Sequence, residues 1–305
     1  AYTGTSQVTQ GILRVTATGN LGGPVNVATL GKLELTGGIL GDNVVNTGGE
    51  VEARGTIEGN LTNANVGAGG GADEGEFMTT GDLTFAPGGT RTFTNAGTAT
   101  IAMGSVLGLS AYTNQTGGIT NITSGRTLQA TTVTNASGAL LIVDGSTIDG
   151  DVVNGGRLNV NGSSTITGDM ANNSVVDMAD GATGDVLNVG GAVSGTGSYE
   201  IDLNLSNGTS DRVSAGLATT GTVNLDFTIT GNGYIGAGVT VFSGAAGGAA
   251  VTGSAALPVG GSIIYTLDQV GSDIQVLSQV NPAVGGVAAL AAMTQSLIGI
   301  IVNRP

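Results

Sequence analysis

The chain has 305 residues, of which only 10% are charged, against roughly 25% in an average globular domain. It contains no cysteine and no histidine, which excludes disulfides, cysteine metal sites, thiolate nucleophiles and the usual general base near neutral pH. The net charge is −14 with eight scattered basic residues, so the clustered cations that bind nucleic acid or anionic membranes are missing.

The N-terminal part repeats a short alternating strand followed by glycine. Leu33–Gly37 aligns with Val51–Gly55, eighteen residues further on, and the same offset relates Ile39 to Ile57. Alternation of apolar and polar residues over four or five positions is the β period, and no helical period of 3.6 accompanies it. Each copy is therefore expected to be one β-strand, and the alignment predicts which strands stack.

An insertion interrupts the repeat between Asn63 and Asn95. It includes the glycine-rich segment Gly67–Glu76, which is typical of a loop that leaves a repetitive rod. The acidic residues of this loop could coordinate Ca²⁺ through carboxylate oxygens, and a solvated acidic loop is the competing interpretation. These weak calcium candidates are Asp73, Glu74 and Glu76. A second glycine- and alanine-rich segment, Gly244–Ala250, is also expected to be a loop.

A recurring asparagine marks the central part of the chain. Two strand-type residues precede it each time, and a small or glycine-rich turn follows. The steps between successive copies are 19, 21, 19, 18 and 16 residues. The copies are Asn95, Asn114, Asn135, Asn154, Asn172 and Asn188, with earlier ones at Asn26, Asn46 and Asn63.

This spacing predicts an all-β fold, a right-handed parallel β-helix (solenoid) with about 18–20 residues per coil. A single unit cannot bury its own apolar face, whereas stacked units form a continuous core. The second strand type agrees with this interpretation, since Leu141–Gly145 aligns with Leu158–Gly162. We expect Asn95, Asn114, Asn135, Asn154, Asn172 and Asn188 to form an internal ladder, in which each amide donates to the next coil.

The segment after residue 191 resembles the C-terminal passenger region of type V autotransporters. Ser194–Leu205 is similar to the glycine-strand opening of that family, Gly208–Val213 to its Ser-Asp-Arg turn, and Tyr265–Leu277 to its closing hairpin. The resemblance covers about a third of the chain. It departs from the family pattern at Gln275 and Val276, where an aromatic residue is expected.

The resemblance implies three parts. Residues 1–191 would be the β-solenoid passenger, 192–280 an autochaperone-like cap that seeds folding, and 281–305 a linker or pore helix leading to a β-barrel that is absent from this chain. In the cap, Arg212 could fix a turn by a charge-assisted hydrogen bond to Asp211, and a surface pair that contributes little is the competing interpretation.

The last part of the chain also stands out by composition. Residues 284–302 carry no charge over nearly the length of a bilayer span, so a short C-terminal helix is expected there. A helix inside a pore or docked on another subunit, a lipid-spanning helix and an extended chain all remain open.

The resemblance further implies a secreted protein at the surface of a Gram-negative bacterium. It would be exported through its own outer-membrane β-barrel and serve as a structural or adhesive passenger, without a cofactor and without enzymatic activity. A surface or glycan ligand would be its partner, and nucleic acid would not.

Two alternatives remain open. A homo-oligomeric filament or surface layer would use the edges of the terminal coils and the flat outer faces. A polysaccharide-acting β-helix enzyme would need a cluster of carboxylates, for which Asp149, Asp151 and Asp169 with Arg157 are the candidates. Turn chemistry is the competing interpretation of these aspartates.

Overall fold

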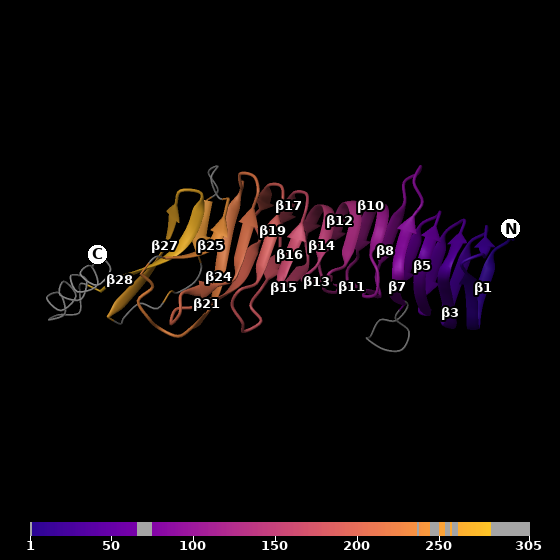
Figure 1. The fold of residues 1–305 in the computed structure, drawn as a ribbon, viewed down its shortest axis with the longest axis horizontal. Coiled ribbons are helices and arrows are strands. Elements are labelled where there is room, and N and C mark those ends of the chain that lie inside the picture. Colours follow the sequence, from indigo (N-terminus) through magenta and orange to yellow (C-terminus); the bar gives the residue numbers. More distant parts are fainter. Residues whose placement is uncertain are drawn as a thin grey trace, which may run out of the picture.

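The computed structural model describes residues 2–65, 75–236, 238–244, 250–253, 257 and 262–281. Figure 1 shows an elongated rod of stacked strands, with the first strand at one end and the last two strands toward the other. The described residues form strands and turns and include no helix, so none of them provides a helix that could span a membrane.

The strands follow one another in chain order along the rod. The first nine are β1 (Ser6–Thr16), β2 (Asn20–Leu21), β3 (Val25–Leu40), β4 (Val44–Thr47), β5 (Glu50–Ile57), β6 (Leu61–Ala64), β7 (Glu76–Phe85), β8 (Thr92–Asn95) and β9 (Thr98–Ile101). The next nine are β10 (Val106–Asn114), β11 (Ile119–Ile122), β12 (Thr127–Asn135), β13 (Leu140–Asp144), β14 (Thr147–Asn154), β15 (Arg157–Asn161), β16 (Ser163–Ile166), β17 (Met170–Asn172) and β18 (Val175–Asp177). The last ten are β19 (Val186–Val189), β20 (Val193–Gly195), β21 (Ser198–Asn204), β22 (Thr209–Ser210), β23 (Arg212–Ala215), β24 (Thr222–Thr230), β25 (Val239–Ser243), β26 (Ala250–Gly253), β27 (Ile263–Val270) and β28 (Asp273–Val280).

Most strands pair in parallel with the equivalent strands of the neighbouring coils. In one column of strands β4 pairs with β6 and β6 with β8; in another β11 pairs with β13 and β13 with β15; in a third β16 pairs with β19 and β19 with β23. The long strand β14 pairs with β16 through its first residues and with β17 through its last ones. The predicted fold class, a right-handed parallel β-helix, is therefore confirmed.

The core lies inside the coils because successive residues of each strand point alternately inward and outward. In β8 and β9 every second residue is buried. Equivalent inward residues stack from coil to coil, as where the ring of Phe93 packs edge-on against Tyr112 at 5.0 Å between centroids. Inward residues of different strands also meet in the interior, since Phe93 packs edge-on against Phe77 of β7 at 4.8 Å. The stacked side chains form one continuous core that runs along the rod.

One of the expected alignments is displaced by a residue. Leu33 pairs with Val51 as predicted, but Ile39 pairs with Thr56, and Leu40 takes the position opposite Ile57. The register shifts after Thr36, because β3 has one residue more at this corner than β5, its partner strand in the next coil. Such a β-bulge changes which residue points inward and does not show in the spacing of glycines.

The parallel stacking continues beyond residue 191, since β21 pairs with β24 and β24 with β26. The arrangement changes at β25, which pairs antiparallel with β28, and β27 and β28 form an antiparallel hairpin. This hairpin is the one expected across Tyr265–Leu277. The division into a passenger, a cap from 192 to 280 and a linker from 281 stays a prediction, because the pairing does not change at residue 191.

Several expectations fall outside the described residues. These are the C-terminal helix, nearly all of the predicted loop Gly67–Glu76 and most of the loop Gly244–Ala250.

The corner inside β14 provides a test of the stacking. Gly150 has a φ of 148°, and a Cβ there would lie 1.7 Å from the carbonyl oxygen of Ala130 in the preceding coil. We expect Gly150→Ala to lower the free energy of unfolding by about 1–3 kcal/mol, because only glycine adopts this conformation readily. Gly155→Ala is the matched control, since its Cβ would meet nothing closer than 3.4 Å. Urea denaturation that finds the two variants equally stable would contradict the described corner.

Candidate functional site

A ladder of asparagine amides runs through the interior. In each step the Nδ2 of one asparagine donates to the Oδ1 of the asparagine in the next coil, over 2.8–3.0 Å. All members are buried. The ladder consists of Asn46, Asn63, Asn95, Asn114, Asn135, Asn154 and Asn172.

Each amide also holds the turn beside it. The Nδ2 of Asn114 donates to the carbonyl oxygen of Leu140 at 2.8 Å, and that of Asn135 to the carbonyl oxygen of Arg157 at 3.0 Å. Both amide protons are thus used, one within the ladder and one on the backbone of the following coil. A buried amide satisfied in this way stabilises the corner, whereas an unsatisfied one would cost about 1–3 kcal/mol.

Two of the asparagines taken as copies of the repeat lie outside the ladder. Asn188 is half-buried and pairs with Thr165 and Ser214 in a different column of strands, and Gly195 lies opposite Asn172 in the next coil. The prediction for Asn188 was wrong because a longer turn precedes β19, which moves the next equivalent position further along the chain. Asn26 is displaced as well, since it pairs with Val45.

The calcium candidates do not form a site that can be described. Asp73 and Glu74 lie outside the described residues, and Glu76 is an exposed residue at the start of β7 that pairs with Glu50 and Thr98. Within the part of the chain that the structure describes, no three acidic side chains are placed to hold a metal ion. Calcium binding by the loop stays a prediction.

The aspartates considered for catalysis bind neighbouring coils. Asp151 accepts a hydrogen bond from the N–H of Asp169 at 2.9 Å, and Asp169 accepts one from the N–H of Ala192 at 2.8 Å. Asp149 accepts hydrogen bonds from Gln129 and Thr167, both at 2.8 Å, and these hold the pKa of Asp149 below its usual value. Asp151 and Asp169 therefore hold backbone turns of the following coil, and Asp149 links side chains of the two neighbouring coils.

Arg157 does not accompany these aspartates. Its guanidinium binds Asp177 and Glu200, each at 2.6 Å, on the outward side of the two following coils. Lys32 makes a similar group with Glu50 and Glu52, each at 2.9 Å. Such ladders of opposite charge align neighbouring coils from the outside.

Asp211 is a buried carboxylate, and its surroundings differ from the expected pair with Arg212. It accepts hydrogen bonds from the N–H groups of Gly184 at 2.9 Å, Asp185 at 3.0 Å and Asp202 at 2.8 Å. Arg212, the next residue in the chain, is exposed. Because neighbouring residues in an extended strand point to opposite sides, the two side chains cannot meet, and the predicted pair was wrong.

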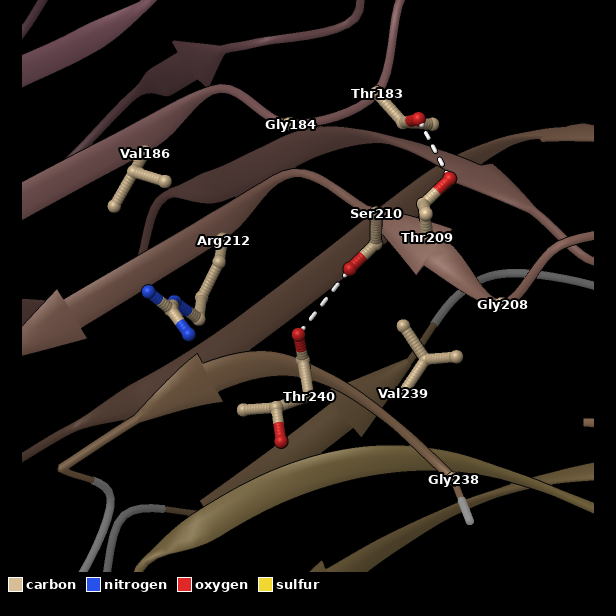
Figure 2. A pocket seen from close by; sticks show the side chains of 10 residues that line it. All are labelled: Thr183, Gly184, Val186, Gly208, Thr209, Ser210, Arg212, Gly238, Val239 and Thr240. Carbon is tan, nitrogen blue, oxygen red and sulfur yellow. Dashed lines mark hydrogen bonds between the residues drawn. The ribbon is translucent and has the colours of Figure 1, made fainter. Parts of the chain in front are cut away.

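Arg212 lines a surface groove near the C-terminal end of the rod. The groove has a volume of about 410 Å³ and lies between the turn before β19, the turn at β22 and the start of β25. Figure 2 shows the Arg212 side chain extending toward the space between Val186 and Thr240. Its walls carry the hydroxyl groups of Thr183, Thr209, Ser210 and Thr240, with Gly184, Gly208, Gly238, Val186 and Val239 between them.

Sequence reasoning did not find this groove. Its lining comes from three successive coils with irregular turns, so no motif in the sequence brings the residues together. The one feature of the sequence that points to the groove is Arg212, which directly follows the inward-facing Asp211.

Comparison with known proteins adds little to this description of the groove and the ladder. No family model matches the chain, and no curated protein matches it. Among solved structures the chain is similar to the Haemophilus influenzae Hap adhesin, with 14% identity and a TM-score of 0.34 over 89% of this chain. The chain spans 40% of the length of that protein.

The ladder predicts a large penalty for removing one amide. We expect Asn135→Ala to lower the free energy of unfolding by about 2–4 kcal/mol, because groups in two neighbouring coils lose their partner. Thr134→Ala, one residue away and facing outward, should cost less than about 1 kcal/mol. The measurement is chemical denaturation followed by circular dichroism. Equal costs at the two positions would show that the ladder does not hold the coils together.

Asp211 predicts a dependence of stability on pH. Burial raises the pKa of Asp211 from 3.8 to about 6, against the opposing effect of its three N–H donors. The folded state then binds this proton more tightly than the unfolded state, so the stabilisation is greatest below pH 4 and falls as the pH rises through 6. Relative to Asp211→Asn, the wild-type chain should lose stability across this window in urea titrations. A relative gain would show that the N–H donors outweigh burial.

Proposed function

We propose that this chain is the solenoid passenger of an autotransporter, exported through an outer-membrane β-barrel and held outside a Gram-negative cell as a structural or adhesive rod. The observation that carries the proposal is the continuous parallel stack, which ends on the antiparallel hairpin of β27 and β28. That hairpin lies within the sequence that resembles the C-terminal passenger region of the family.

The physics of the stack suits folding after export. Each coil contacts mainly its neighbours, so a folded C-terminal coil offers a template on which the next coil can form. The absence of cysteine means that no disulfide can form before passage through a narrow pore. The small share of charged residues, 10%, reduces the number of groups that must be desolvated on the way.

The bonding of the candidate carboxylates supports a structural role over an enzymatic one. Asp151 and Asp169 already accept hydrogen bonds from backbone N–H groups, and Asp149 from two side chains. Carboxylates used in this way link neighbouring coils, which favours a structural role for them.

The proposal predicts that the C-terminal coils seed folding. We would produce the chain with a signal peptide and an autotransporter barrel in a Gram-negative host, and treat intact cells with protease. The wild-type rod should be surface-accessible to antibody and resistant to protease. Replacing the buried Ile274 and Val276 by serine should make the whole rod protease-sensitive while export continues.

The matched control carries the same type of change at the other end. Replacing the buried Val25 and Val27 by serine should leave the C-terminal coils protease-resistant and expose only the first ones. Retention of the wild-type rod inside the cell would refute the proposal. Equal sensitivity of the two double variants would remove the seeding role of the C-terminal part.

A further inference from the structure

The groove around Arg212 has the size and chemistry of a small-ligand site. Its volume of about 410 Å³ falls in the range of roughly 300–1,000 Å³ found for such sites. Three glycines and two valines leave its walls short and partly apolar, and the polar groups gather around one cation. The lining suits a compact ligand that has both polar and apolar sides.

Arg212 differs from Arg14, Lys32 and Arg157, which each bind carboxylates of neighbouring coils. Within the described residues Arg212 takes part in no ion pair, as is also true of Arg54, Arg91 and Arg126, although the chain carries a net charge of −14. Of these arginines, Arg212 lines the groove. An exposed guanidinium offers a planar fork of donors that matches a carboxylate in two parallel hydrogen bonds.

Three of the hydroxyl groups that line the groove, those of Thr183, Thr209 and Ser210, already donate their protons to other groups of the protein. Thr209 donates to Asn207 at 2.7 Å, so in the 2.7 Å contact between Thr183 and Thr209 it is Thr183 that donates. Ser210 donates to the carbonyl oxygen of Thr240 at 3.2 Å. These contacts, drawn in part in Figure 2, leave the lone pairs of Thr183 and Ser210 as acceptors.

The groove therefore combines acceptors for ligand O–H groups with one strong donor for an anion. A neutral sugar would leave Arg212 without a partner, and a simple carboxylic acid would leave the acceptors unused. We propose that the groove binds a carboxylated sugar, with the carboxylate on Arg212, ring hydroxyl groups on Thr183 and Ser210, and the apolar ring face against Val186 and Val239. This site goes beyond the proposed surface display, since the purified chain would bind its ligand without export.

Binding is tested on the purified chain of 305 residues by saturation-transfer NMR. The probes are D-glucuronic acid and N-acetylneuraminic acid, with D-glucose and acetate as neutral and ring-free controls. At least one acidic sugar should bind saturably, and at least about 10-fold more tightly than either control. The two acidic probes distinguish a uronic acid from a nine-carbon acidic sugar. Failure of both, or equal binding of acetate, overturns the proposal.

Variants assign the binding to the groove. Arg212→Gln should weaken binding of the acidic sugar by about 10-fold to 100-fold, since a charge-assisted pair is lost. Arg54→Gln removes another exposed arginine in β5 and should leave binding unchanged. Thr183→Val should weaken binding of the acidic sugar several-fold and leave the saturation-transfer signal of acetate unchanged. Unaltered binding by Arg212→Gln, with an unchanged unfolding midpoint, would place the ligand elsewhere and contradict the assignment.

Discussion

The structure depends on the vertical alignment of its coils, and the asparagine ladder is the interaction that fixes it. From Asn63 to Asn154, each side-chain amide of the ladder donates to the asparagine of one neighbouring coil and accepts from the asparagine of the other. A coil that slipped by one residue would turn its asparagine outward and leave two neighbours with unpaired buried atoms. The ladder thus selects one register, while stacked apolar side chains such as Phe93 and Tyr112 fill the core beside it.

This constraint explains which features could be predicted from the sequence. A residue type that must recur once per coil leaves a period that can be counted, so the fold class and Asn95 to Asn172 were predictable. The bulge after Thr36 and the longer turn before β19 were not, because an extra residue at a corner alters the register without altering the local pattern. For that reason Ile39 and Asn188 were placed wrongly.

The interior leaves little freedom for function, since the buried apolar residues of the described coils pack into one continuous core. Variation is possible on the outward residues and in the turns, where a coil can be lengthened without disturbing the core. The groove around Arg212 arises in this way, from turns of unequal length in three adjoining coils. A site assembled across coils has no spacing along the chain that sequence reasoning could recognise.

The dipeptide Asp211–Arg212 contributes both to the packing of the coils and to the groove on their surface. The inward carboxylate of Asp211 binds the N–H groups of Gly184 and Asp185, which fixes the turn that carries Thr183. The outward guanidinium of Arg212 lies in the groove that this same turn borders. The shape of the groove therefore depends on the buried carboxylate of Asp211, and the charge of the groove depends on the exposed guanidinium of Arg212. Successive residues of an extended chain point to opposite sides, which prevents Asp211 from pairing with Arg212. The same alternation lets Asp211 fix a turn beside the groove while Arg212 places a positive charge in it.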